Sequence, residues 1–137
     1  MEVNNKIGKL HHMAFVSPDC EKLLKTYQDM LGQGTVENLD SVLPETIFRV
    51  LNVNGMKYEF FTPTGEKSFM YQYLQDYPKG GIHHICYAVD NIEEATKDLV
   101  NKGYTVSGPM GTATNNNKYQ FFQPNDFGNI QIELLQC

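Results

Sequence analysis

The chain has 137 residues, a formal net charge of −5 and 41% hydrophobic residues. This length suits one compact domain with a real core and is too short for two independent domains. The acidic balance argues against nucleic acid as a partner, because that ligand requires a basic face. The sequence contains no apolar run long enough to cross a bilayer and no signal-peptide pattern at residues 1–9. Three scattered cysteines indicate reduced thiols, so we expect a cytoplasmic protein without a membrane partner.

The first half of the chain predicts a strand, a helix and then strands joined by tight turns. Ser17 and Pro18 suit the cap and the first position of a helix, and Gly32 suits its end. Asn54-Gly55 is typical of a two-residue hairpin turn. The predicted elements are a strand at 10–16, a helix from 18 to 31, a short strand within 34–44, and strands at 47–53 and 56–61.

Residues 64–80 form a linker, and the second half then repeats the first. The linker pattern predicts a short helix at 68–74 that turns Phe69, Tyr73 and Leu74 toward the core. The second half predicts a strand at 82–88, a helix with an apolar stripe, a strand starting near 104–106, a loop at 108–117, and strands at 118–122 and 130–135. Asp90 with Glu93 would cap that helix, and the stripe consists of Ile92, Ala95, Leu99 and Val100. We therefore expect one domain at 8–136, with modules at about 8–63 and 81–136.

A pair of adjacent histidines opens each module. Leu10–Val16 matches Ile82–Ala88 position by position, so that His12 corresponds to His84. Successive strand residues point to opposite faces, which gives the two histidines of each pair different surroundings. His84 shares its face with Cys86 and other small residues, and small residues leave room for a ligand. The pattern predicts that His84 faces a cavity and that His83 does not.

Each module also carries a glutamate in the middle of its last strand. Glu59 and Glu133 occupy equivalent places in the repeat. A carboxylate among apolar neighbours is costly unless it is paired or bound to a cation, although an edge strand could leave it in solvent. Together with His12 and His84 the glutamates form a nitrogen and oxygen donor set for a divalent metal ion such as Zn²⁺, Co²⁺, Ni²⁺, Mn²⁺ or Fe²⁺.

Over residues 8–136 the chain resembles the vicinal oxygen chelate superfamily, and within it the methylmalonyl-CoA epimerase branch. The phrases that carry the resemblance are LHHMA at 10–14, EFFTP at 59–63, GIHHI at 81–85, VDNI at 89–92 and IELLQ at 132–136. The resemblance implies an α+β fold in which two βαβββ modules form a curved mixed sheet around a metal-binding cleft. It also implies that His12, Glu59, His84 and Glu133 bind the metal.

The resemblance further implies an epimerase or isomerase that removes a proton next to a carbonyl of an acyl thioester. Glu133 would carry the proton while the metal binds neighbouring oxygens of the substrate. Epimerisation needs a second base, and the strand at 47–53 has no carboxylate, which leaves Glu45 as the candidate. We expect a small-molecule substrate, such as a CoA thioester, and a homodimer.

Other activities fit the same residues. A glyoxalase I-like lactoylglutathione lyase would use the same two histidines and two glutamates. A ring-cleaving dioxygenase needs only three protein ligands, so Glu59 would be surplus. A non-catalytic small-molecule binding protein of the same fold needs no metal, and four potential ligands argue against it. Bound metal separates the binding protein from the enzymes, and the substrate separates the enzymes from one another.

Overall fold

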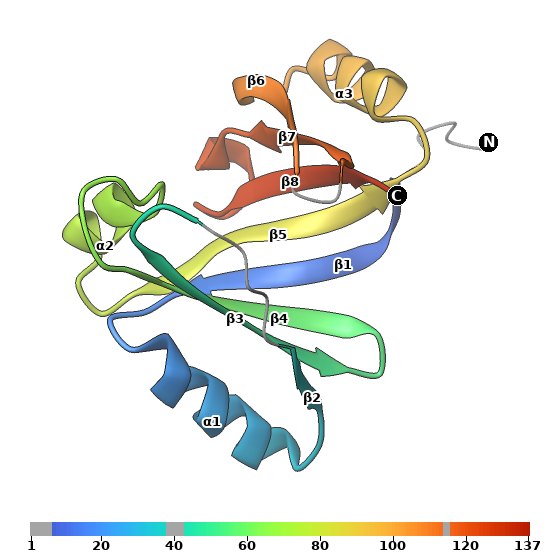
Figure 1. Ribbon diagram of the computed structural model, residues 1–137. Helices are drawn as coiled ribbons and strands as arrows, with labels where there is room; N and C mark the ends of the chain where they lie inside the picture. The colour runs from blue at the N-terminus through green and yellow to red at the C-terminus, as the bar shows by residue number, and fades with distance from the viewer. Residues whose placement is uncertain (1–6, 38–42, 114–115) are drawn as a thin grey trace. The chain divides into compact units, whose positions relative to one another are not determined.

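The computed structural model describes residues 7–37, 43–113 and 116–137 and has the α+β architecture expected from the sequence (Figure 1). Each half of the chain contains a strand, a helix and three further strands, which confirms the paired βαβββ modules. The chain divides into two compact units: the first unit is residues 12–83, and the second unit combines the described residues before 12 with 84–137. The boundary therefore falls inside the first strand.

The helices and strands follow the predicted order with modest shifts at their ends. They are β1 (Ile7–Val16), α1 (Cys20–Leu31), β2 (Thr35–Glu37), β3 (Thr46–Val53), β4 (Met56–Pro63), α2 (Tyr71–Asp76), β5 (Gly81–Val89), α3 (Ile92–Asn101), β6 (Val106–Thr112), β7 (Lys118–Phe122), the short 3-10 helix η1 (Pro124–Asp126) and β8 (Gln131–Gln136). Part of the predicted 34–44 segment lies outside the described residues, but its short strand is β2. No described helix has the length and apolar character needed to cross a membrane.

In the first unit β4 is an interior strand. It pairs antiparallel with β3 on one side and parallel with β1 on the other, through residues 12–16 of β1. The predicted hairpin turn joins β3 to β4, with positive φ at both Asn54 and Gly55. β2 pairs antiparallel with the outer side of β3. Any side chain on β4 therefore has strand neighbours on both sides.

The two faces of this sheet pack differently. The apolar stripe of α1 covers one face, where Leu24 packs with Phe15, Leu51 and Phe60. The linker helix α2 covers part of the opposite face, where Ala14, Val16, Phe48, Val50, Phe61 and Met70 form a second cluster with Tyr73 and Leu74. Phe69, which was expected in the core, is 55% exposed, and Met70 is buried in its place. The prediction was wrong by one residue because α2 starts later than its sequence pattern suggests.

Both long helices are capped one or two residues later than predicted. The Asp19 side chain accepts a hydrogen bond from the Lys22 N–H, so Asp19 rather than Ser17 caps α1. The Ser17 hydroxyl instead accepts from the Asp19 N–H. In α3 the cap is Asn91 rather than Asp90. Several neighbouring residues in each segment are good caps, and only the chain's exit from the preceding strand decides which one is used.

The second unit has the order β5-β8-β7-β6, with β5 and β8 parallel. The stripe of α3 packs against the sheet through Ile92, Ala95 and Leu99, while Val100, predicted to belong to it, is 47% exposed. The segment 108–112 was expected to be a loop but continues β6. Its pairing with β7 is irregular between Ser107 and Gly111, as an outer strand tolerates. The sequence did not predict this part of the strand because it contains Gly108, Pro109 and Gly111, which are typical of loops.

The end of the linker approaches β1 closely. Gly80 has φ +81°, and a Cβ at this position would collide with the backbone carbonyl of Val16. All the atoms that this Cβ would meet belong to the backbone of Val16 and Ser17, so no flexible side chain could move to relieve the collision. Gly80 is thus required both by its left-handed backbone and by the space available.

We expect Gly80→Ala to destabilise the fold markedly, since it adds a backbone collision to left-handed strain. Gly103→Ala is the matched control, because Gly103 has φ +100° with open space around it. The free energy of unfolding from urea denaturation should fall by about 1 kcal/mol in the control and by about 3 kcal/mol or more for Gly80→Ala. Equal losses would show that space at Gly80 is not limiting.

Candidate metal centre

The first unit brings one histidine and one glutamate together. His12 lies on β1 and Glu59 on the interior strand β4, and the ladder pairs Ala14 with Glu59. His12 Nε2 is 3.4 Å from Glu59 Oε1. The side chains are 6% and 14% exposed, so both polar groups have left bulk water.

The second unit repeats this arrangement. His84 lies on β5 and Glu133 on β8, and the ladder pairs Cys86 with Glu133. His84 Nε2 is 3.3 Å from Glu133 Oε1, and both side chains are similarly buried. In each unit the glutamate is therefore opposite the residue two positions after the histidine. The repeat in the sequence extends to the register of the strands.

These positions exclude the solvent-exposed alternative for the glutamates. β4 lies between β3 and β1, and β8 lies between β5 and β7, so neither glutamate is on an edge strand. Burying a carboxylate costs free energy unless its negative charge is compensated. The compensation comes either from a protonated imidazole beside it or from a cation that binds both groups.

The spacing within each pair fits a shared cation. Metal bonds of about 2.0–2.2 Å at right angles place neighbouring ligand atoms about 3 Å apart. The 3.4 Å and 3.3 Å separations are close to that value. Nitrogen and carboxylate oxygen donors suit divalent transition metals. Each unit thus presents one nitrogen donor and one oxygen donor whose spacing suits such an ion.

His83 and His84 have the different surroundings expected from strand alternation. The His84 ring meets the Phe121 ring edge to face at 5.1 Å, on the face that also carries Glu133. The His83 ring instead contacts Tyr73 of α2 at 5.3 Å. The Tyr73 hydroxyl donates to the Ile82 carbonyl, and burial raises the pKa of that hydroxyl. Tyr73 therefore remains a proton donor that holds the start of β5.

Phe121 was missed by the sequence reasoning. It is directly opposite Glu133 in the β7–β8 ladder and contacts Tyr119 as well as His84. The spacing of Tyr119 and Phe121, two residues apart on a strand, places both on one face and could have suggested an aromatic wall. Pairing β7 with β8 was needed to assign that wall to the histidine.

Glu45, the candidate second base, and Lys118, a basic residue at the start of β7, have different surroundings. Glu45 is exposed, immediately precedes β3 and has φ +45°, and its carbonyl accepts a hydrogen bond from the Thr64 N–H at 2.7 Å. Such a backbone is uncommon for a residue with a side chain and is held here by the linker. Lys118 donates to Glu93 at 2.7 Å, which lowers the pKa of the Glu93 carboxyl. That ion pair is consistent with an ordinary surface lysine.

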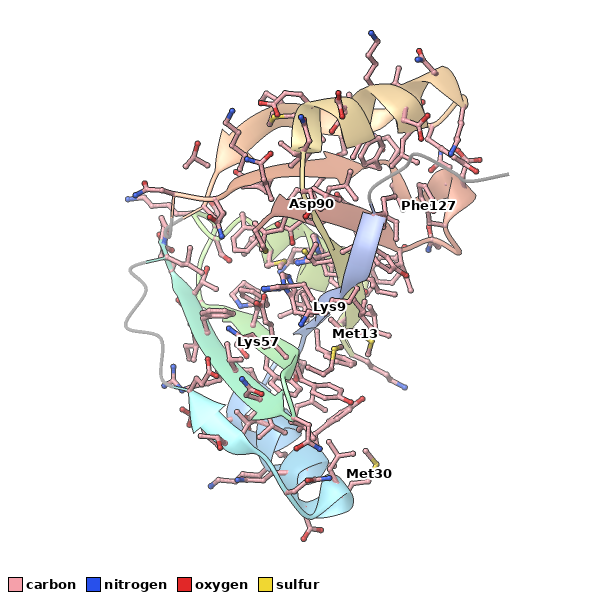
Figure 2. All side chains as sticks on the ribbon, turned by 90° about the vertical axis from the view of Figure 1, so that its right-hand side faces the viewer. Lys9, Met13, Met30, Lys57, Asp90 and Phe127 are labelled. Carbon is pink, nitrogen blue, oxygen red and sulfur yellow. The ribbon has the colours of Figure 1, made fainter. Side chains whose placement is uncertain are left out.

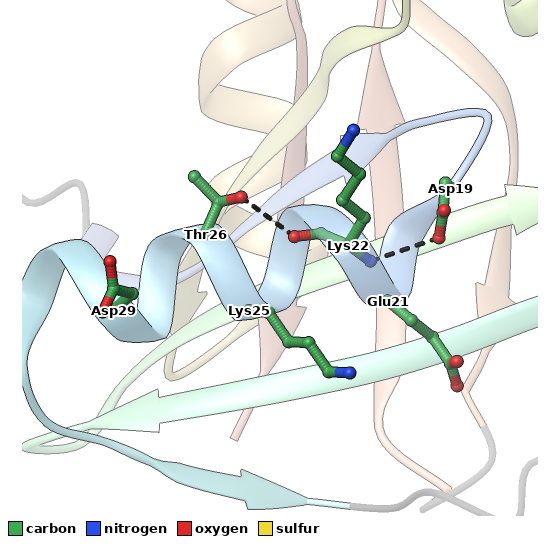
Figure 3. A pocket seen from close by; sticks show the side chains of 6 residues that line it. All are labelled: Asp19, Glu21, Lys22, Lys25, Thr26 and Asp29. Carbon is green, nitrogen blue, oxygen red and sulfur yellow. Dashed lines mark hydrogen bonds between the residues drawn. The ribbon is translucent and has the colours of Figure 1, made fainter.

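A depression on the surface lies along α1 (Figure 3). Its lining consists of Asp19, Glu21, Lys22, Lys25, Thr26 and Asp29. All six come from one helix and its cap, and they carry charges of both signs. None of the candidate metal ligands lines it, so it is a polar helix surface rather than an active site.

Several known proteins are similar to this chain in sequence and in fold. The family model described as glyoxalase/bleomycin resistance protein/dioxygenase superfamily matches residues 11–122. Mitochondrial methylmalonyl-CoA epimerase of Mus musculus is 36% identical over 135 residues, covering 96% of this chain and 75% of that protein. An ethylmalonyl-CoA/methylmalonyl-CoA epimerase of Cereibacter sphaeroides is 33% identical over 132 residues, covering 95% and 98%.

A solved structure supports the same fold. Methylmalonyl-CoA epimerase from Mycobacterium tuberculosis has a TM-score of 0.74 at 21% identity, covering 99% of this chain and 92% of that one. The resemblance inferred from the histidine and glutamate phrases is confirmed by these matches. The chain belongs to the glyoxalase/bleomycin resistance protein/dioxygenase superfamily.

Proposed function

We propose that this protein is a divalent-metal-dependent epimerase that acts on methylmalonyl-CoA or a closely similar acyl thioester. Its relatives named methylmalonyl-CoA epimerase are enzymes, and they match this chain over nearly its whole length. The observation that carries the proposal is the buried histidine–glutamate pair in identical register in each unit. Buried polar pairs of this kind add little to the stability of the fold, whereas they supply the ligands that a metal-assisted reaction needs.

His12, Glu59, His84 and Glu133 are the proposed metal ligands. When bound, the ion acts as a Lewis acid that stabilises negative charge on substrate oxygens. The support comes from the ligand types, the burial of all four side chains and the short distance within each pair. The metal is one of Co, Ni, Zn, Mn or Fe, since each accepts mixed nitrogen and oxygen ligands.

Glu133 is the proposed base for one face of the substrate carbon. Its carboxylate is held 3.3 Å from His84 Nε2 on an interior strand, and a carboxylate fixed beside the substrate can accept a proton from it. Glu45 is the proposed base for the other face. Among the described residues from 43 to the end of β3 it is the one carboxylate, and its carbonyl accepts a hydrogen bond from the Thr64 N–H in an unusual backbone conformation. Two bases are needed because epimerisation removes a proton from one side and returns it to the other.

A lactoylglutathione lyase of the glyoxalase I kind remains the alternative activity, since it would use the same four ligands. The relatives favour the epimerase. A binding protein without metal is disfavoured by three buried donors and a fourth, Glu59, whose side chain is 14% exposed. We also propose a cytoplasmic location, which the three free cysteines support, and a homodimer, which light scattering of the purified protein would test.

The metal proposal predicts about one divalent ion per chain after metal loading, measured by elemental analysis. His84→Ala should remove most of this binding, because it deletes a ligand. His83→Ala is the matched control and should retain the metal, because the His83 ring packs on Tyr73. Equal loss of metal in the two variants would contradict the assignment from strand faces.

Glu133→Gln should keep part of the metal and lose turnover. The amide oxygen can still coordinate, but an amide cannot accept the proton. A loss of about 100-fold or more in kcat is expected for removal of a general base. Metal content, measured on the same sample, separates this result from loss of the ligand, and unchanged turnover would leave Glu133 a ligand only.

The reaction itself is tested by isotope exchange. Metal-loaded protein in D₂O should introduce deuterium next to the carbonyl of methylmalonyl-CoA, because the mechanism removes that proton. Glu45→Gln should abolish epimerisation while retaining exchange at one face, which mass spectrometry and a stereospecific assay distinguish. The hemithioacetal of methylglyoxal and glutathione is the control substrate. Turnover of the control alone would favour the lyase.

A further inference from the structure

The Glu45 side chain lies against the linker, at the end of the β3–β4 pair that is remote from its hairpin. Lys57, labelled in Figure 2, marks the hairpin end, and Glu45 immediately precedes β3 at the other end. A Cβ added to Gly65 would collide with the Glu45 Oε1 atom and would lie 2.7 Å from the Glu45 Cδ atom. The Glu45 carboxylate therefore occupies the place that a side chain at residue 65 would take.

Hydrogen bonds hold the backbone on both sides of this contact. Glu45 has φ +45°, and its carbonyl accepts from the Thr64 N–H at 2.7 Å. The Thr46 hydroxyl forms a hydrogen bond of 2.6 Å with the hydroxyl of Ser68, which is 5% exposed. The Ser68 N–H donates to the Gly65 carbonyl at 3.0 Å and closes the turn that contains Gly65. The start of β3 and this turn are thus tied together, and the Glu45 side chain begins from a fixed backbone.

The Glu45 carboxylate is exposed and can accept a proton. Within the described part of the chain, no side chain or backbone group forms a hydrogen bond or an ion pair with it. A long exposed side chain can adopt several rotamers, but a base acts only when it is within hydrogen-bond reach of the proton. The rotamer of Glu45 that lies across the turn is accessible because Gly65 has no Cβ.

We propose that Gly65 is a positioning residue for the second base, because its lack of a side chain lets the Glu45 carboxylate lie across the linker turn. This inference rests on the proposed function, in which Glu45 serves one face of the substrate carbon. At that face the carboxylate takes the proton, and the electron pair of the C–H bond passes into the thioester carbonyl. Return of the proton reverses the step. Displacement of the carboxylate should slow it, because proton transfer depends on the distance between base and carbon.

An alanine at residue 65 separates this positioning role from a role in folding. Gly65 does not have a positive φ, so its backbone accepts an alanine without strain. The three atoms nearest to the added methyl group all belong to the Glu45 side chain, whose exposed end can turn away into solvent. Gly65→Ala should therefore leave the urea midpoint of unfolding unchanged or slightly raised.

The activity test uses metal-loaded protein and methylmalonyl-CoA. In Gly65→Ala the kcat for epimerisation should fall about 10-fold or more and KM should change by less than about twofold, while deuterium exchange at one face is retained. Gly103→Ala is the matched control, because it makes the same change after α3 with open space around it. The control should lower the urea midpoint and keep kcat within about twofold of the parent. The two variants thus have opposite expected effects on stability and turnover.

A double variant tests whether Gly65 acts through Glu45. The exchange that Glu45→Gln retains at the other face should stay within about twofold when Gly65→Ala is added, because the carboxylate is already absent. The contact itself is tested without substrate by nuclear Overhauser effects. These should connect the γ-protons of Glu45 with the α-protons of Gly65 in the parent.

Several results would overturn the inference: no such contact in the parent, epimerisation by Gly65→Ala at the parent's rate, an equal loss of kcat in Gly103→Ala, or a further loss of exchange in the double variant. A urea midpoint that falls in Gly65→Ala as far as in Gly103→Ala would assign Gly65 to the fold instead. Failure of the proposed function is a separate outcome. In that case the parent neither exchanges nor epimerises methylmalonyl-CoA, and the role of Gly65 in catalysis falls with it, while the contact between Glu45 and Gly65 persists.

Discussion

The buried histidine–glutamate pair of each unit is the interaction on which the rest of the structure depends. A carboxylate placed on an interior strand loses its water and has to be compensated where it stands. The compensation is an imidazole about one hydrogen-bond length away, His12 for Glu59 and His84 for Glu133. A hydrophobic pair of equal size would cost less, so the retention of these polar groups is a cost to stability. The proposed use of these side chains as metal ligands would account for that cost.

In each unit the long helix packs on the sheet face opposite the histidine and glutamate side chains. The apolar sides of α1 and α3 cover the opposite faces with clusters around Phe60 and Leu134. On the ligand face the residues next to the histidines are small, namely Ala14 and Cys86, and both are fully buried. Larger residues would fill the space over the donors. In each unit a helix thus packs on one face of the sheet, while a small residue lies two positions after the histidine on the other face.

The surroundings of the donors differ between the two units, although their registers are alike. In the second unit an aromatic ring, Phe121, meets His84 edge to face. In the first unit the neighbouring positions are polar, with Lys57, Asn52 and Glu37 linked across three strands. A duplicated module can therefore supply equal ligands while its outer strands supply unequal contacts.

The sequence alone predicted the order of elements and the repeat, because periodicity and turn residues are local properties, and the repeat in turn identified four candidate donors. His84 was distinguished from His83 by alternation along a single strand. The features that depend on which strands pair, and in which register, required the tertiary structure. The sequence left open that Glu59 and Glu133 are on edge strands and face solvent. The strand pairing excludes this, because β4 and β8 are interior strands. Phe121 was assigned to His84 and Glu133 only through the register of the β7–β8 ladder, since a register joins residues that are distant in the chain.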